Sequence, residues 1–151
     1  LKALGYAANT GRVCVADDSG LSVDALDGRP GVMSARFAGS IGTRDERDAA
    51  NNAMLLALMD GVPDDKRSAR FECAVCVADP NGTIIAESHG TFEGVISREP
   101  AGENGFGYDS LLYLPDVQKT SAQLSSQEKN ARSHRGEAVQ KIASCFSQMH
   151  D

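Results

Sequence analysis

The sequence contains no tryptophan, few aromatic residues and too few basic residues to balance its acids. Its 21 acidic side chains outnumber its 15 lysines and arginines, and the net charge of −6 argues against a nucleic-acid polymer as partner. A small phosphorylated ligand is compatible with this charge if a divalent cation offsets the repulsion. No apolar run approaches the roughly 20 residues that span a bilayer, so we expect no membrane partner. No segment of the 151 residues resembles a secretory signal peptide.

Cysteine is scarce, and its spacing favours neither a disulfide nor a zinc site. Two of the four cysteines, Cys73 and Cys76, have CxxC spacing but fall within a predicted strand over residues 70–77. Residues three apart on a strand face opposite sides of the sheet, so the two thiols cannot easily share a metal. We expect reduced cysteines in the core of a cytoplasmic protein.

The order of the predicted elements indicates one α/β domain covering residues 1–151. Capping boxes with Thr43 and Ser125 as N-caps predict two helices. Apolar spacing and turn residues predict the remaining helices at residues 1–8 and from 136 to about Met149, strands at 13–16, 69–78, 83–96 and 111–114, and a hairpin turn at 79–82. Strands and helices alternate only partly and the hairpin is antiparallel, so we predict a mixed β-sheet rather than a doubly wound parallel one.

An initiator methionine is absent as well. The chain opens at Leu1, within the pattern of an amphipathic helix. We expect that an N-terminal part of the protein is missing from this sequence.

Residues 13–20, VCVADDSG, carry the first candidate site. We predict a short buried strand at 13–16 that leads into a turn bearing Asp17 and Asp18, the acidic pair. Open α/β sheets bind ligands at the carboxyl ends of their strands, and adjacent carboxylates suit Mg²⁺. Neighbouring side chains point in different directions, so one carboxylate would hold the ion and the other would orient or deprotonate a water. The alternative is an Asx turn in which the acids bond their own backbone.

Two further segments carry candidate binding groups. Residues 105–109, GFGYD, place Phe106 between two glycines, a plausible stacking surface for a flat base; we call this segment the aromatic loop. The alternative is a glycine-rich turn with the ring packed in the core. Lys129, His134 and Arg135 form a basic group suited to phosphates or carbonyls. The alternative for these three is a solvated charge cluster at helix ends.

Together and in this order, the segments resemble the Ham1/inosine triphosphate pyrophosphatase family. The matching stretches are residues 16–21 (ADDSGL), 23–26 (VDAL), 30–31 (PG), 34–37 (SARF), 93–94 (EG), 105–109 (GFGYD), 128–130 (EKN) and 133–136 (SHRG). The resemblance implies hydrolysis of non-standard purine nucleoside triphosphates (ITP, dITP, XTP) to the monophosphate and pyrophosphate with Mg²⁺. It also implies a cytoplasmic homodimer with an elongated mixed sheet and two lobes around a cleft.

The resemblance also implies roles for individual residues. Asp18 corresponds to the family's general base and metal-linked carboxylate, with Asp17 as a further metal candidate, and Ser19 lies beside the substrate. Phe106 would stack on the purine within a base-binding segment that includes Gly107, Tyr108 and Asp109. Lys129, His134 and Arg135 would grip the base and phosphates.

Two departures from the family pattern keep other functions open. The family's N-terminal strand, its Thr/Ser-x-Asn-x-x-Lys phosphate loop and a metal-binding glutamate are not among these residues, and Ser110 stands where the family usually has proline. One alternative is therefore a non-catalytic nucleotide-binding dimer that has lost its phosphate loop. Another is the related Maf-type pyrophosphatase, which lacks the Ser-His-Arg segment.

Overall fold

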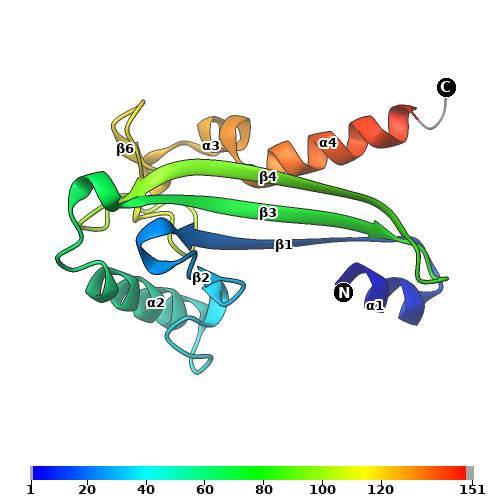
Figure 1. The fold of residues 1–151 in the computed structure, drawn as a ribbon, viewed down its shortest axis with the longest axis horizontal. Helices are drawn as coiled ribbons and strands as arrows, with labels where there is room; N and C mark the ends of the chain where they lie inside the picture. The colour runs from blue at the N-terminus through cyan, green and yellow to red at the C-terminus, as the bar shows by residue number, and fades with distance from the viewer. Residues whose placement is uncertain (1, 149–151) are drawn as a thin grey trace. The chain divides into compact units, whose positions relative to one another are not determined.

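The helices and strands follow from a computed structural model that describes residues 2–148, without the side chains of 145–148. The elements are α1 (Lys2–Thr10), β1 (Cys14–Val23), β2 (Pro30–Gly31), α2 (Arg44–Leu58), β3 (Ser68–Ala78), β4 (Ile84–Ile96), β5 (Leu112–Leu114), β6 (Lys119–Thr120), α3 (Ser126–Arg132) and α4 (His134–Gln148) (Figure 1). The strands form one sheet in the order β2-β1-β3-β4-β5-β6. The pairs β1–β2, β4–β5 and β5–β6 are antiparallel. The predicted α/β class is confirmed.

Local sequence signals account for several of these boundaries. Thr43 caps α2 through its hydroxyl oxygen, which accepts from the Glu46 N–H, while the Glu46 carboxylate accepts from the Thr43 N–H at 2.7 Å. Ser125 and Glu128 make the same reciprocal pair at the start of α3. In the hairpin between β3 and β4, the Asp79 carboxylate accepts from the N–H groups of residues 81 and 83. Both predicted capping boxes and the predicted hairpin are therefore confirmed.

The predicted turn at the acidic pair is wrong, because β1 continues through it to Val23. Gly20 does not break the strand but lets β2 approach, since a Cβ there would lie 2.4 Å from the Gly31 carbonyl oxygen. Pairing with neighbouring strands fixes an extended backbone that local propensity disfavours. The Asx-turn alternative is excluded together with the turn.

The chain forms two compact units. Unit 1 comprises residues 1–19, 72–91 and 132–151, and unit 2 comprises residues 20–71 and 92–131. The single-domain assignment stays a prediction. Within the described residues, no helix has both the length and the apolar character that crossing a membrane requires.

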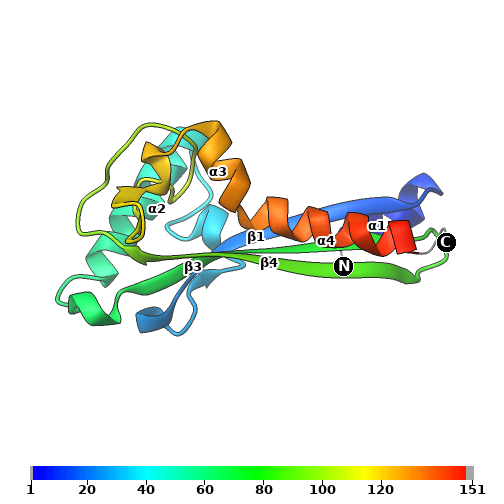
Figure 2. The same ribbon diagram turned by 90° about the horizontal axis from the view of Figure 1, so that it is seen from above.

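In unit 1, β3 packs against a different helix on each face. Cys73, Val75 and Val77 are buried against Ala138 and Ile142 of α4. The intervening residues Cys76 and Ala78 pack with Ala3 and Ala7 of α1. Side chains alternate between the two faces of β3, which explains both clusters. Figure 2 shows α4 running along the sheet beside β4. The two CxxC thiols face opposite sides and are free. Met149 and the side chain of Cys145 lie outside the described residues.

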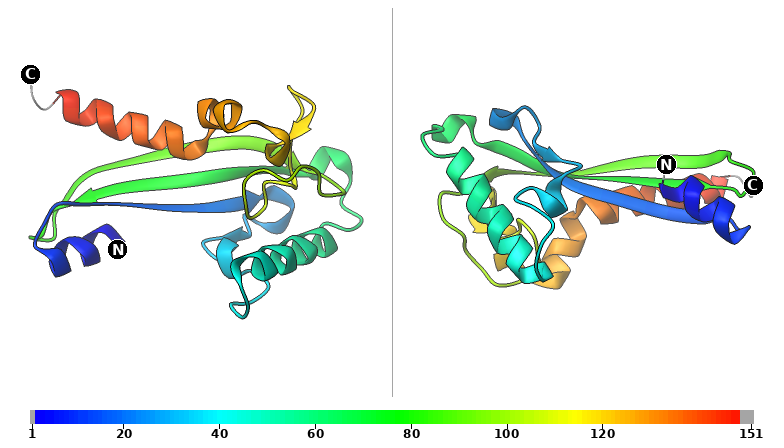
Figure 3. Two further views of the ribbon diagram at one scale, coloured as in Figure 1. Left: turned by 180° about the vertical axis from the view of Figure 1, so that it is seen from behind. Right: turned by 90° about the horizontal axis from the view of Figure 1, so that it is seen from below.

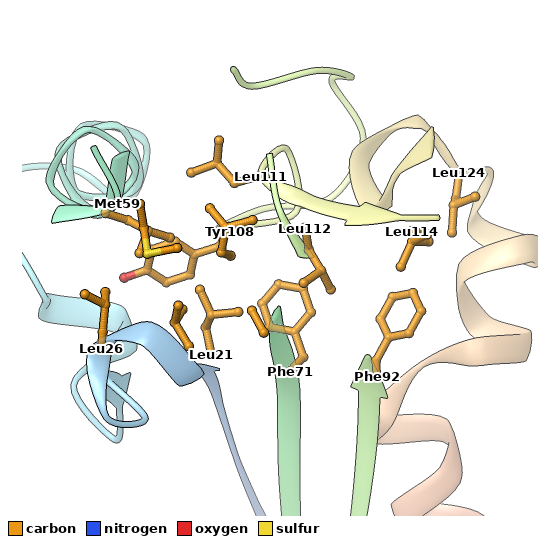
Figure 4. Close-up of a cluster of buried hydrophobic side chains, with 14 residues drawn as sticks. Leu21, Leu26, Met59, Phe71, Phe92, Tyr108, Leu111, Leu112, Leu114 and Leu124 are labelled. Atoms are coloured by element: carbon orange, nitrogen blue, oxygen red, sulfur yellow. The ribbon is translucent and has the colours of Figure 1, made fainter. Parts of the chain in front are cut away.

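Unit 2 holds the larger core. Figure 4 shows leucines from β1, β5 and the loop before β5 packed with Phe71 and Phe92. The Tyr108 ring lies among them and is 4% exposed. Asn51 of α2 binds the short helix η2 (Ser34–Arg36) by donating to the Ser34 carbonyl and accepting from the Ala38 N–H, so α2 packs against this segment (Figure 3). The core thus fixes the two elements, α2 and the aromatic loop, that build the candidate site of this unit.

Candidate active site

In unit 1, Arg135 joins two residues of β1. Its Nε lies 3.1 Å from the Asp17 carboxylate and 3.2 Å from the Ser19 hydroxyl oxygen. Asp17 and Ser19 are two residues apart and so share one face of the strand. The guanidinium and the carboxylate are each about half exposed, beside a hollow of about 400 Å³ whose walls include Val15, Val75 and Val139. This group can hold an anion or hydrogen-bond a carbonyl beside a carboxylate.

The start of α4 is held against β4, and this positions Arg135. Gly90 permits the contact, because a Cβ there would lie 2.1 Å from the carbonyl oxygen of His134. Glu137 accepts from the Thr91 N–H and from Lys141. Its hydrogen bonds from Lys141 and then from Thr91 lower the pKa of Glu137, so it is ionised at neutral pH. His134 is buried at this junction, with 9% of its surface exposed.

Asp18 lies on the other face of β1. Its neighbours two and four residues back, Ala16 and Cys14, pack against the α1 side of unit 1, whereas Asp17 faces Arg135. The α1 residue Lys2 donates to the backbone oxygen of Asp17 at 3.0 Å. The carboxylates of the acidic pair therefore point to opposite faces and cannot chelate one ion together.

In unit 2, the aromatic loop presents the Phe106 ring at the surface. The ring is 51% exposed, which excludes the alternative in which it packs in the core. Two cations lie over it: the Arg44 guanidinium carbon is 4.4 Å and the Lys129 Nζ 5.4 Å from its centroid. An exposed aromatic face flanked by cations suits an electron-rich heterocycle.

The rest of the loop supports that ring. The buried Asp109 carboxylate accepts from the Phe106 N–H, the Ser121 hydroxyl and Lys129. Burial raises the pKa of Tyr108, so its hydroxyl stays protonated and donates to the Ser34 carbonyl at 2.8 Å. Gly105 has φ +81°, and a Cβ there would overlap the Asp109 carboxylate. Tyr108, Asp109 and Gly105 thus build the loop.

Three α2 residues at this site were not predicted from the sequence. Arg44 lies over the Phe106 ring, Asp48 accepts from the Gly107 N–H at 2.8 Å, and Asn52 donates to the Gly107 carbonyl at 3.0 Å. They are spaced four apart and so share one face of the helix, and we call them the polar stripe. The spacing was visible in the sequence, but a polar helix face is usually solvated, so nothing local distinguished it.

The described residues offer few ligands for a metal ion. Among the side chains that the structure describes, which end at residue 144, no three from His, Cys, Asp or Glu are gathered to hold one. Mg²⁺ nevertheless binds through one or two carboxylates, with waters and substrate phosphates completing its shell. The exposed Asp18 carboxylate fits such a site, whereas Asp17 is engaged by Arg135.

Comparison with curated proteins finds relatives over nearly the whole chain. A sequence named dITP/XTP pyrophosphatase from Desulforamulus reducens is 51% identical over 149 residues, covering 99% of this chain and 72% of the relative. One of the same name from Nitratidesulfovibrio vulgaris is 52% identical over 145 residues, covering 94% and 69%.

Solved structures agree with the sequence comparison. The Staphylococcus aureus Ham1 protein superposes with a TM-score of 0.88 at 37% identity, covering all of this chain and 74% of that one. A HAM1 protein from Coxiella burnetii gives 0.88 at 42% identity, covering 97% and 73%. A sequence model described as the Ham1 family matches residues 1–145. The chain therefore belongs to the Ham1 family, rather than to the Maf-type alternative.

Proposed function

We propose that this protein hydrolyses non-standard purine nucleoside triphosphates, such as ITP, dITP and XTP, to the monophosphate and pyrophosphate. The observation that carries the proposal is the family membership, with relatives about half identical that are named dITP/XTP pyrophosphatase. In this reaction a water oxygen bonds to the α-phosphorus, the bond to the bridging oxygen breaks, and pyrophosphate leaves with that oxygen. The chain must bind a purine, activate a water and stabilise negative charge.

Unit 2 supports base binding. Phe106 offers a half-exposed ring, its N–H donates to Asp109, and the backbone of the next residue, Gly107, is held by Asp48 and Asn52. Lys129 is fixed by Asp109 beside that ring and adds a positive charge. We assign Phe106 to stacking on the base and Lys129 to the polar edge of the nucleotide.

Unit 1 supports the chemistry. We assign Asp18, exposed on an extended strand, as the base that takes a proton from the attacking water. Asp18 would also hold Mg²⁺, which when bound neutralises phosphate charge. Arg135, aligned by Asp17 and Ser19, would bind the nucleotide through its remaining N–H groups, and His134 stays a candidate. The homodimer and the cytoplasmic location implied by the family resemblance stay predictions.

The direct test is pyrophosphate release from a panel of triphosphates with Mg²⁺. We expect ITP, dITP and XTP to be hydrolysed well above ATP, because they carry a carbonyl oxygen at purine C6 where ATP carries an amino group. A site that presents hydrogen-bond donors to purine C6 leaves those donors unpaired when it meets the amino group of ATP. Such a mismatch can favour ITP over ATP by about 10⁴-fold. Chelation of divalent cations should stop the reaction. Tight ITP binding without hydrolysis would instead support the non-catalytic alternative.

The variant Phe106→Ala should raise the KM for ITP more than it lowers kcat. Stacking on a base contributes about 1–3 kcal/mol, so we expect KM to rise about 5- to 140-fold. Phe106→Leu is the matched control, because it keeps apolar volume but lacks the flat ring and should resemble Phe106→Ala. Steady-state kinetics and a thermal melt measure the two effects. Unfolding of both variants with KM unchanged would show that the ring serves the fold instead.

A further inference from the structure

The polar stripe of α2 has two different relations to the aromatic loop. Asp48 and Asn52 grip the loop backbone through the N–H and the carbonyl of Gly107. Arg44 instead touches a side chain, with its guanidinium carbon 4.4 Å from the centroid of the Phe106 ring. Two residues of the stripe therefore fix the loop, and the third covers its exposed ring.

Arg44 is anchored at one end and extended at the other. It is the first residue of α2, directly after the Thr43 cap, so its backbone position is fixed by the capping box. Its side chain is exposed and reaches the ring. A guanidinium is planar and weakly hydrated, and it stacks on aromatic faces where a lysine ammonium acts only as a point charge.

We propose that Arg44 is a substrate-binding residue that forms the second wall of the base subsite. The purine stacks on Phe106, and the Arg44 guanidinium moves outward to lie against the opposite face of the purine. This inference rests on the proposed function, because it requires Phe106 to bind the base. It extends base binding to Arg44 on α2. The planar guanidinium of Arg44 favours a purine over a smaller ring.

The division of labour within the stripe supports this arrangement. The ring cannot easily retreat, because the N–H and carbonyl groups of Phe106 and Gly107 are all bonded to protein groups. The arginine side chain has several rotatable bonds and can move away by one ring thickness, about 3.5 Å. Opening the stack therefore displaces Arg44 and leaves the loop in place.

The test compares Arg44→Ala with Arg47→Ala, a control that removes an equal charge from the same helix. Arg47 donates to the Gly42 carbonyl and has no contact with the ring among those described. We expect Arg44→Ala to raise the KM for ITP about two- to fivefold, the effect of an exposed cation–π contact, with kcat within about twofold. Arg44→Lys should fall between wild type and Arg44→Ala. Inhibition by inorganic triphosphate, which has no base, should be unchanged in Arg44→Ala.

Each outcome bears on a separate claim. Equal KM values for Arg44→Ala and wild type would refute the second wall, and so would weaker inhibition by inorganic triphosphate, since Arg44 would then bind phosphate. A lower KM would mean that the arginine competes with the base. Phe106→Ala measured alongside separates these failures from failure of the proposed function, because it raises KM whenever the ring binds the base. A thermal melt of each variant confirms that it is folded.

Discussion

Replacement of Asp18 by Asn is expected to lower kcat for ITP hydrolysis by at least about 100-fold while leaving nucleotide binding measurable. An amide of the same shape cannot take a proton from water, and general base catalysis contributes about 10²–10⁴-fold. Asp18 is exposed on β1, so the exchange removes no buried contact and should leave the thermal stability unchanged. Single-turnover release of pyrophosphate and a separate ITP titration distinguish chemistry from binding.

The neighbouring Asp17 supplies the matched control. Asp17→Asn removes the same charge one residue away but on the opposite face of the strand, where it pairs with Arg135 at 3.1 Å. We expect kcat to fall less than about tenfold, a barrier change below about 1.4 kcal/mol. If the two variants lost activity equally, the assignment of the base to Asp18 would fail.

The second large effect is on stability. Arg67→Met should lower the free energy of unfolding by about 3–5 kcal/mol, a large fraction of the 5–15 kcal/mol of a typical domain. The Arg67 side chain is 4% exposed and donates to four carbonyl oxygens. Two of these, from Met59 and Val62, follow the end of α2, and two, from Ile96 and Ser97, lie at the end of β4. Methionine fills similar space but leaves the acceptors without their charged donor.

Arg98→Met is the control for this measurement. Arg98 is 58% exposed and pairs with the exposed Asp64 at 2.6 Å. Exposed ion pairs contribute about 0–1 kcal/mol, so urea unfolding should change by no more than that. A loss below about 1 kcal/mol for Arg67→Met as well would show that water replaces the buried contacts.

Local signals predicted the starts of two helices. Thr43 and Ser125 begin helices because side-chain caps act within three residues. The turn at the acidic pair was wrong because the extended backbone there depends on strands distant in the chain. The opposed directions of the two carboxylates were predicted, but the pairing of Asp17 with Arg135 was not.

The residues of the candidate site likewise include some that the sequence predicted and some that it did not. Phe106, Lys129 and Arg135 were predicted from their own neighbourhoods and from the family pattern, and their roles stay predictions. The polar stripe depends on a loop more than 50 residues away, the Gly107 bonds to Asp48 and Asn52 spanning 59 and 55 positions. A single sequence carries no signal for a contact of that range.

The main-chain hydrogen bonds of Phe106 and Gly107 limit how the proposed base subsite could change its preference. The N–H and carbonyl groups of Phe106 and Gly107 all have partners within the protein. A new base would therefore find both of these main-chain N–H donors already engaged, although each carbonyl oxygen can accept a second hydrogen bond. Any new hydrogen-bond donor toward the base, whether acquired by natural drift or by engineering, would have to come from side chains around this loop. A library varying Arg44 and Lys129 while retaining residues 105–109 would sample that change with the least damage to folding.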